Sequence, residues 1–284
     1  MIQEIGTSLM LTLAYLVSCF LLFFIGKVAY QLFHRNIKVN EELVIKDNLA
    51  FALSNTGYYI GLLFAIAGAM SGQSDGLVAD LIAIMTYGLV GIILLNLSTI
   101  ISDKFLLAKF KVTEEITGRQ NAGVGLVEGA VAAGSGMIIF AALYTEGFGL
   151  GTAIGFWVVG QILFVLTGMV YNAIVPYDTH EHLSKLNVAV GIGKAGALIG
   201  LANIMRAAIM HPFEDWTSTI VIISYELVLG LIFLPICRLV TDKILLPGQN
   251  LTDEIVNQEH PNIGAAIIEA FAYIGGSVLI TLAI

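Results

Sequence analysis

The segment Asn48-Leu-Ala-Phe-Ala-Leu-Ser-Asn55 decides the fold, because degenerate copies of it begin at Asn121, Asn187 and Asn262. Each copy starts with Asn and has Ala or Gly two and four positions later. A polar or ionisable residue follows at position seven and a Gly at position thirteen, and each copy opens a long apolar run. Agreement at five positions in four places indicates an internal repeat, which is the first feature to establish in an unknown chain.

The composition places these repeats in a membrane. Of the 284 residues, 57% are hydrophobic and only 12% are charged, whereas a soluble domain carries roughly 25% charged residues. Such a chain cannot cover a water-facing surface, which excludes a soluble enzyme, a disordered protein and a nucleic-acid-binding protein. The net charge of −8 also argues against a nucleic-acid partner. The two cysteines lie in apolar runs and are too few for a disulfide scaffold.

Eight apolar runs are each long enough to cross a bilayer, which takes about 20 residues. In lipid, each segment must satisfy its own backbone hydrogen bonds, so helices are expected. The sequence therefore predicts an all-α, polytopic membrane bundle of eight transmembrane helices, arranged as four parallel two-helix repeats. The predicted spans are 5–33, 48–71, 77–102, 121–144, 148–175, 187–210, 216–239 and 262–284.

The basic residues predict the orientation. Eleven of the 13 Lys and Arg residues, Arg238 among them, lie in the longer connections or at the adjoining helix ends. The exceptions are Lys194 and Arg206, inside the sixth span. The positive-inside rule then places the longer connections in the cytoplasm and both termini outside it.

A second level of repetition divides the chain into halves at 1–145 and 146–284. Asp103-Lys-Phe-Leu-Leu matches Asp242-Lys-Ile-Leu-Leu, and Thr113-Glu-Glu-Ile matches Thr252-Asp-Glu-Ile. Because each unit is a pair of spans, every copy enters the membrane from the same side. The repeats are therefore expected to be parallel rather than inverted.

The polar residues at position seven are the candidate site: Asn55, Glu128, Lys194 and Glu269. Seven residues are almost two helical turns, so each shares a face with its repeat Asn and lies about 10 Å deeper. We expect the four faces to converge on a central axis. Lys194 should then contact at least one of Glu128, Glu269 and Glu226, directly or through water. Glu226 is a lone acid in the seventh span. Ionisable residues in a span are costly and mark either a static ion-pair network or an ion or proton path.

The repeat residues Asn48, Asn121, Asn187 and Asn262 have two structural interpretations. Asn is a favoured helix N-cap. It also forms hydrogen bonds between membrane helices.

The stretch Asp47-Asn-Leu-Ala-Phe-Ala52 followed by Gly57-Tyr-Tyr-Ile-Gly61 resembles the YjfL-like bacterial inner-membrane proteins, which carry tandem copies of domain of unknown function 350. The resemblance covers essentially the whole chain and implies a bacterial inner-membrane location. It supplies no activity, substrate or catalytic residue.

Two classes of function follow. The first is a channel or transporter for protons or small cations. The second is a non-transporting scaffold or envelope-stress component that recruits a soluble partner to the cytoplasmic loops. A continuous wetted path past the position-seven residues would favour transport, and a dry, closed packing would favour a scaffold. No catalytic, cofactor or metal motif is present, so we expect no enzyme. Besides lipid, a homodimer is expected, packed through Gly147-x-Gly149-x-Gly151 and Gly155.

Overall fold

The computed structural model describes residues 2–144, 149–246 and 248–283. In this part of the chain, eight helices are long and apolar enough to cross a membrane, so the expected all-α, eight-span bundle is confirmed. The long helices are α1 (Ile2–Phe33), α2 (Leu49–Ala69), α3 (Leu77–Leu106), α4 (Ala122–Tyr144), α5 (Gly149–Ile174), α7 (Val188–Ile209), α8 (Trp216–Val240) and α9 (Ile263–Ala283).

Short helical turns occupy the longer connections. A turn of π-helix precedes α2, α4 and α9, and the short helix α6 precedes α7. The residues just before the first three repeat Asn residues, Asp47, Gln120 and Leu186, all have left-handed backbones with φ of 48°, 50° and 62°. The bounds of the turns are Glu41–Ile45, Glu114–Gly118 and Asp253–Asn257, with α6 at Thr179–Ser184 and a further π-turn at Thr241–Leu245 after α8.

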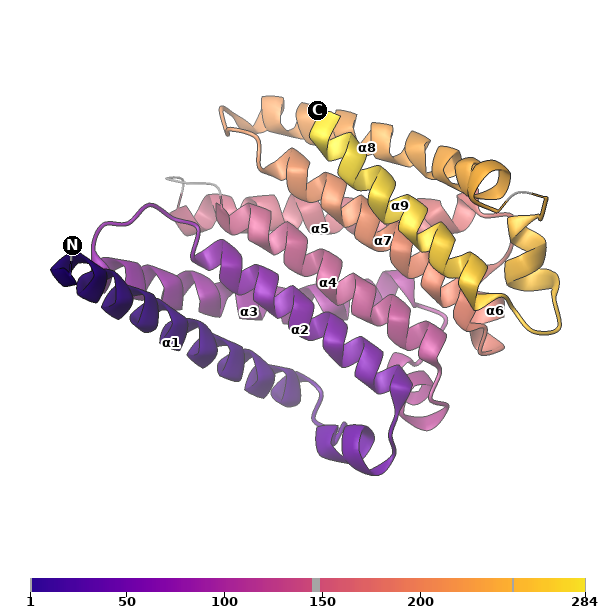
Figure 1. Cartoon of the computed structure of the whole chain (residues 1–284), viewed down its shortest axis with the longest axis horizontal. Helices are drawn as coiled ribbons and strands as arrows, with labels where there is room; N and C mark the ends of the chain where they lie inside the picture. The colour runs from indigo at the N-terminus through magenta and orange to yellow at the C-terminus, as the bar shows by residue number, and fades with distance from the viewer. Residues whose placement is uncertain (1, 145–148, 247, 284) are drawn as a thin grey trace.

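The long helices form two layers (Figure 1). Helices α2, α4, α7 and α9 lie side by side in chain order, each packed against the next. Helices α1, α3, α5 and α8 form the second layer, in which α3 packs on α2 and α4, α5 on α4 and α7, and α8 on α7 and α9. The expected convergence of four faces on a central axis is therefore wrong: the four helices form a row with α2 and α9 at its edges.

Glycine explains why a row forms instead of a ring. A Cβ at Gly57 would collide with the backbone of Gly129, so α2 and α4 approach at backbone contact. On its other side, α4 meets α7, where a Cβ at Gly191 would lie 2.5 Å from the Cα of Gly123. Because α4 carries small residues on two opposite faces, it packs closely with two neighbours.

The two ends of the bundle differ. The repeat Asn residues and the short helical turns lie at one end, called here the asparagine end. Both termini and the shorter connections lie towards the other, called the terminal end (Figure 1).

Candidate functional site

Each repeat Asn caps its own helix. The side-chain oxygen of Asn48 accepts a hydrogen bond from the backbone N–H of Phe51 at 3.1 Å. The equivalent bonds run from Val124 to Asn121 at 3.2 Å, from Val190 to Asn187 at 3.2 Å and from Ala265 to Asn262 at 3.0 Å. These bonds satisfy one of the free N–H groups at each helix start.

The same side chains also join one repeat to the next. The amide nitrogen of Asn48 donates to the carbonyl of Ile116 at 2.9 Å, that of Asn121 to Leu183 at 2.8 Å and that of Asn187 to Ile255 at 2.9 Å. We call each of these three bonds an asparagine latch. The same Asn side chain thus caps its helix and bonds to the next repeat, which gives these residues a structural role in the bundle.

The position-seven residues are all buried, but no ion pair joins any two of them in the described part of the chain. Lys194 and Glu269 are 0% exposed, Asn55 is 2% and Glu128 is 8% exposed. The ammonium of Lys194 has no hydrogen-bond or ion-pair partner among the described residues, so the structure shows no direct contact with Glu128, Glu269 or Glu226. Lys194 lies on α7, which has α4 on one side and α9 on the other.

Glu269 instead forms an ion pair with Arg238 of α8. The hydroxyl of Tyr273 donates to the same carboxyl oxygen at 3.1 Å, and Arg238 also donates to the hydroxyl of Thr252 at 2.8 Å. The guanidinium lies 5.5 Å from the ring centre of Tyr177, within range of a cation–π interaction. The negative charge of Glu269 is therefore compensated inside the protein.

Glu128 has a different neighbour. The carboxyl of Asp103, near the end of α3, lies close enough to interact with it electrostatically, and Ser54 and Tyr30 also face it. One oxygen of Asp103 is buried without a hydrogen-bond partner. Within the described residues, no Lys or Arg forms an ion pair with either carboxyl. We call Asp103 and Glu128 the acid pair.

The tandem halves make this contrast specific. Glu128 and Glu269 are equivalent by the repeat, and so are Asp103 and Asp242. Four residues before each Asp, the first half has Thr99 where the second has Arg238. One structural position therefore holds a charge-compensated carboxyl in one half and an uncompensated acid pair in the other.

Gly193 completes the second-half site. A Cβ there would lie 2.5 Å from a carboxyl oxygen of Glu269, so only Gly leaves room for the ion pair as it is placed. The first half has Ser54 at the equivalent position, beside Glu128. The two halves thus differ at both positions that surround the repeat Glu.

Two polar cavities open at the asparagine end. The first, of about 580 Å³, reaches Asp103 and is lined also by Asn36, Lys104, Lys111 and Glu114. It gives the acid pair access to water from that end.

The second cavity, of about 550 Å³, is lined by Lys109, Tyr177, Asp178 and His180. Burial, together with the charge of Lys194, holds the pKa of the nearby His180 below its usual range. Burial raises the pKa of Tyr177 to about 12. Both side chains are therefore neutral near pH 7, and Lys194 acts on this cavity through its field rather than through an ion pair.

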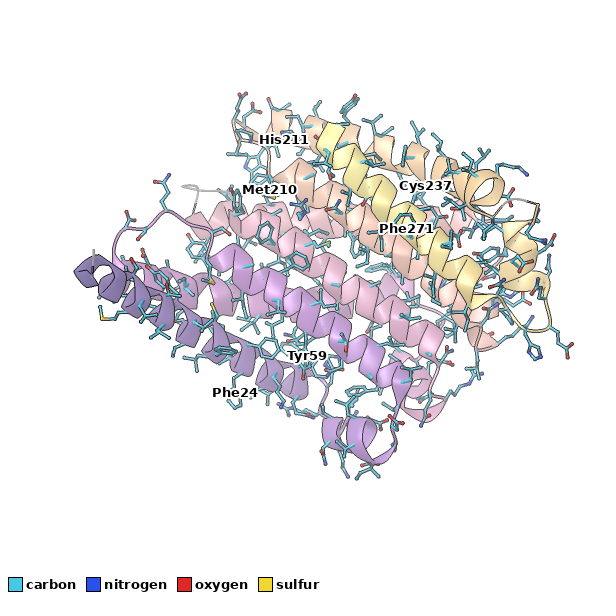
Figure 2. All side chains as sticks on the ribbon, in the orientation of Figure 1. Phe24, Tyr59, Met210, His211, Cys237 and Phe271 are labelled. Carbon is cyan, nitrogen blue, oxygen red and sulfur yellow. The ribbon has the colours of Figure 1, made fainter. Side chains whose placement is uncertain are left out.

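Glu226 lies near the terminal end. One of its carboxyl oxygens is 2.6 Å from the Nε2 atom of His211, which follows α7. Figure 2 labels His211 at that end of the bundle. Glu226 is thus separate from the site at the asparagine end.

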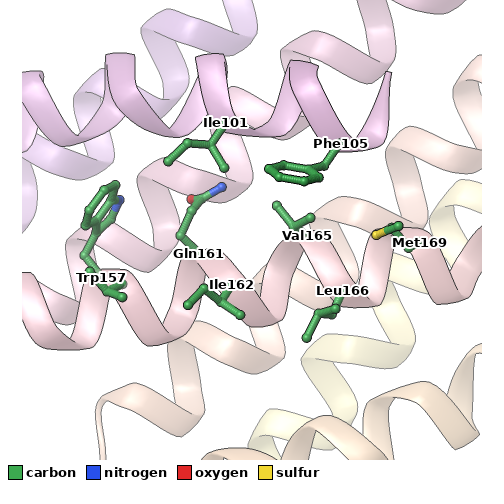
Figure 3. A pocket seen from close by; sticks show the side chains of 9 residues that line it. Ile101, Phe105, Trp157, Gln161, Ile162, Val165, Leu166 and Met169 are labelled. Carbon is green, nitrogen blue, oxygen red and sulfur yellow. The ribbon is translucent and has the colours of Figure 1, made fainter. Parts of the chain in front are cut away.

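A lateral groove between α3 and α5 is the most apolar cavity described (Figure 3). It measures about 480 Å³ and is lined by side chains such as Ile101, Phe105, Val165 and Met169. Its polar wall residue, Gln161, already donates to Ser102 at 2.9 Å. Without an ionisable side chain in its lining, the groove has the character of a lipid-facing surface.

The sequence missed three of these residues. Asp103 stood in a matched Asp-Lys motif, Arg238 was counted with the cations of the loops and helix ends, and no motif singled out His211. Arg238 lies in the last turn of α8, as expected for a helix end, but its side chain is only 13% exposed and points to a buried partner. A lone Arg close to the end of an apolar run was the available signal.

The comparisons with known proteins agree with this repeated architecture. The family described as "Domain of Unknown Function (DUF350)" matches residues 4–143 and again residues 145–284. The chain belongs to the DUF350 family. It is also 26% identical over 278 residues to a UPF0719 transmembrane protein of Aquifex aeolicus (strain VF5), an alignment that covers 95% of this chain and 98% of that protein. No solved structure matches the chain.

This DUF350 protein is therefore a multi-pass integral membrane protein built from two tandem domain copies. Neither name is that of an enzyme.

Proposed function

We propose that this DUF350 protein is a proton or small-cation transporter of the bacterial inner membrane, with the acid pair Asp103 and Glu128 as its cation-binding site. The observation that carries the proposal is the pairing of Arg238 with Glu269. In the second half, a tethered guanidinium neutralises the repeat Glu. In the first half, a second acid, Asp103, lies within electrostatic range of the equivalent carboxyl, and no Lys or Arg of the described residues forms an ion pair with either acid.

Two neighbouring carboxyls in a largely buried site do not both stay ionised without a counter-charge. A proton or a small cation entering through the cavity at Asp103 would supply that charge. The positive-inside rule places this cavity on the cytoplasmic side and both termini outside the cytoplasm.

The route beyond the acid pair favours a carrier over an open channel. Asn96 donates to the hydroxyl of Tyr58 at 3.0 Å, which marks the next polar layer. Past it, α2 and α3 fill the interior with buried apolar side chains, including Leu62, Ile92 and Leu95. Passage to the terminal end therefore requires these helices to move.

Flux into liposomes tests the proposal. The purified protein is reconstituted into vesicles with a pH-sensitive dye inside, and pH, Na⁺ and K⁺ gradients are applied in turn. We expect cation-dependent flux that is lost in Glu128→Gln and Asp103→Asn. Flux at the wild-type rate in both variants would overturn the assignment of the acid pair.

A sharper variant copies the second half into the first. Thr99→Arg places a guanidinium at the position equivalent to Arg238, so the acid pair acquires its own cation. We expect a folded protein without flux, whereas Thr99→Val should transport like the wild type. Thermal unfolding in detergent reports whether each variant is folded.

The closed packing of the row favours the second candidate, a scaffold that recruits a soluble partner to the cytoplasmic loops. Gly57 and Gly129 at backbone contact leave no space for an ion between α2 and α4. If the wild-type protein moves neither protons, Na⁺ nor K⁺ under any gradient, the scaffold is the better account. Neither candidate requires an enzymatic step or a cofactor.

A further inference from the structure

Each asparagine latch joins one repeat to the following repeat, so the Asn of the last repeat forms no latch. Asn48, Asn121 and Asn187 each donate to the following repeat, but Asn262 belongs to the last one. Its amide nitrogen donates only to Glu254, within its own repeat, at 2.7 Å. At the other edge, Leu43 stands where the later repeats have Ile116 and Ile255, directly after the Glu that bonds the repeat Asn. No Asn of the described chain donates to the carbonyl of Leu43.

Burial follows the same pattern. The latch-accepting residues Ile116, Leu183 and Ile255 are at most 2% exposed, whereas Leu43 is 36% exposed. Among the donors, Asn48, Asn121 and Asn187 are buried, but Asn262 is exposed. Each edge of the row thus presents one half of an interface that the chain forms three times internally.

The outer faces of α9 and α2, the helices at the two edges of the row, also carry the two halves of the internal helix contact. On α2 and α4, the residue at position two packs on the residue at position four of the next repeat helix, as Ala50 does on Gly125. On α9, position two is the exposed Gly264, where a Cβ would meet only the side chain of Asn262. On α2, position four is the partly exposed Ala52.

The joint between the two DUF350 copies is the precedent for an intermolecular contact. The first copy meets the second through α4 and α7, with different surfaces on the two sides. Such a heterologous contact always leaves a complementary surface at each end. We propose that a second copy of this chain continues the row, with α9 of one protomer against α2 of the next, as a head-to-tail oligomer.

This edge differs from the internal contacts at one position. Phe271 of α9, labelled in Figure 2, is 63% exposed where α2 and α7 have Gly57 and Gly196. It would oppose Thr56 of the neighbouring protomer, at the place where Gly57 opposes Gly129. The intermolecular helices should therefore lie farther apart than α2 and α4, with the ring of Phe271 between them.

The α5 glycines offer a weaker surface for the expected homodimer. A Cβ at Gly155 would lie 2.6 Å from the ring of Trp216, so this Gly is used inside the chain. Gly151 has open space, and Gly147 lies outside the described residues.

Disulfide trapping tests the head-to-tail contact. In a protein with Cys19→Ala and Cys237→Ala, the substitutions Gly264→Cys and Ala52→Cys are introduced together, and membranes are oxidised before denaturing electrophoresis. We expect a ladder of dimers and larger multimers, because every protomer carries both halves of the contact. A mixture of the two single-cysteine proteins, co-reconstituted in one bilayer, should stop at the mixed dimer.

Leu32→Cys with Gly264→Cys is the matched control. Leu32 is exposed and lies near the same end, but on α1 in the other layer. This pair should trap far less. Equal trapping in the control, or trapping of each single variant with itself, would overturn the proposal, since neither is expected of a heterologous contact.

A second measurement does not depend on cysteines. Asn262→Ser keeps a helix-capping oxygen but removes the amide donor. Native mass spectrometry from a mild detergent should show multimers of the 30.4 kDa chain that are reduced several-fold in this variant. A monomer alone in the wild-type protein, together with no disulfide ladder in membranes, would overturn the head-to-tail oligomer while leaving the transport proposal unaffected.

Discussion

Arg238 of α8 forms an ion pair with Glu269 of α9, and both side chains are withdrawn from the surface of the bundle. The pair joins the two layers near the asparagine end. It also identifies what the first half lacks, because Thr99 stands at the position equivalent to Arg238. The two halves therefore differ in whether the repeat Glu has a guanidinium as its partner.

Removing Arg238 should be strongly destabilising. Arg238→Ala leaves Glu269 buried without its counter-charge, which typically costs about 3–5 kcal/mol. We expect a clear fall in the unfolding temperature in detergent. Adding Glu269→Gln should restore much of the loss, because the orphaned charge is gone. A single Arg238 variant as stable as the wild type would contradict the compensating role of the ion pair.

Lys194 should behave in the opposite way. Its ammonium is buried without a partner, so Lys194→Met removes an uncompensated charge and keeps most of the apolar volume. We expect unchanged or higher thermal stability, with no need for second changes at Glu128 or Glu269. A large loss of stability in Lys194→Met would mean that the ammonium has a bound partner in the membrane.

The close approach of α2 and α4 predicts a sharp difference between two glycines. Gly57→Ala places a methyl group into the backbone of Gly129, so the helices must separate, at a cost of about 1–3 kcal/mol. Gly151→Ala meets nothing within 4 Å and should gain up to about 1 kcal/mol of helix propensity. Thermal unfolding of the two variants side by side checks the contrast.

His180 should make stability depend on pH. Its pKa is lowered in the folded protein from the ordinary value of 6.5, because burial and Lys194 disfavour the imidazolium. The unfolded chain therefore binds a proton more readily. Stability should be constant above pH 6.5 and fall as the pH drops below it, towards the lowered pKa. In His180→Gln, this decline should become smaller, and the part that remains includes the contribution of His34, whose pKa burial also lowers from 6.5.

The membrane class, the eight spans and the tandem repeat could all be predicted from the sequence, because they depend on local properties. Hydropathy over about 20 residues decides a span. Matched residue types at the same offsets after Asn48, Asn121, Asn187 and Asn262 reveal a repeat, whichever helices pack against each copy. Helix capping by these Asn residues was one of the alternatives for the same reason, since a cap involves only the next turn of its own helix.

Only the tertiary structure decided which faces meet. The polar stripe of each repeat suggested convergence on one axis, but glycines on opposite faces of α4 favour a row. Lys194 lies on α7, between α4 and α9, but pairs with neither Glu, because Glu269 pairs with Arg238 of α8 and Glu128 faces Ser54 and Asp103 of the first half. The partners Asp103 and Arg238 come from α3 and α8, so no spacing along the repeat helices could assign them. Side-chain partners depend on helix packing, and packing in lipid depends on small differences in close contact that a hydrophobic pattern does not record.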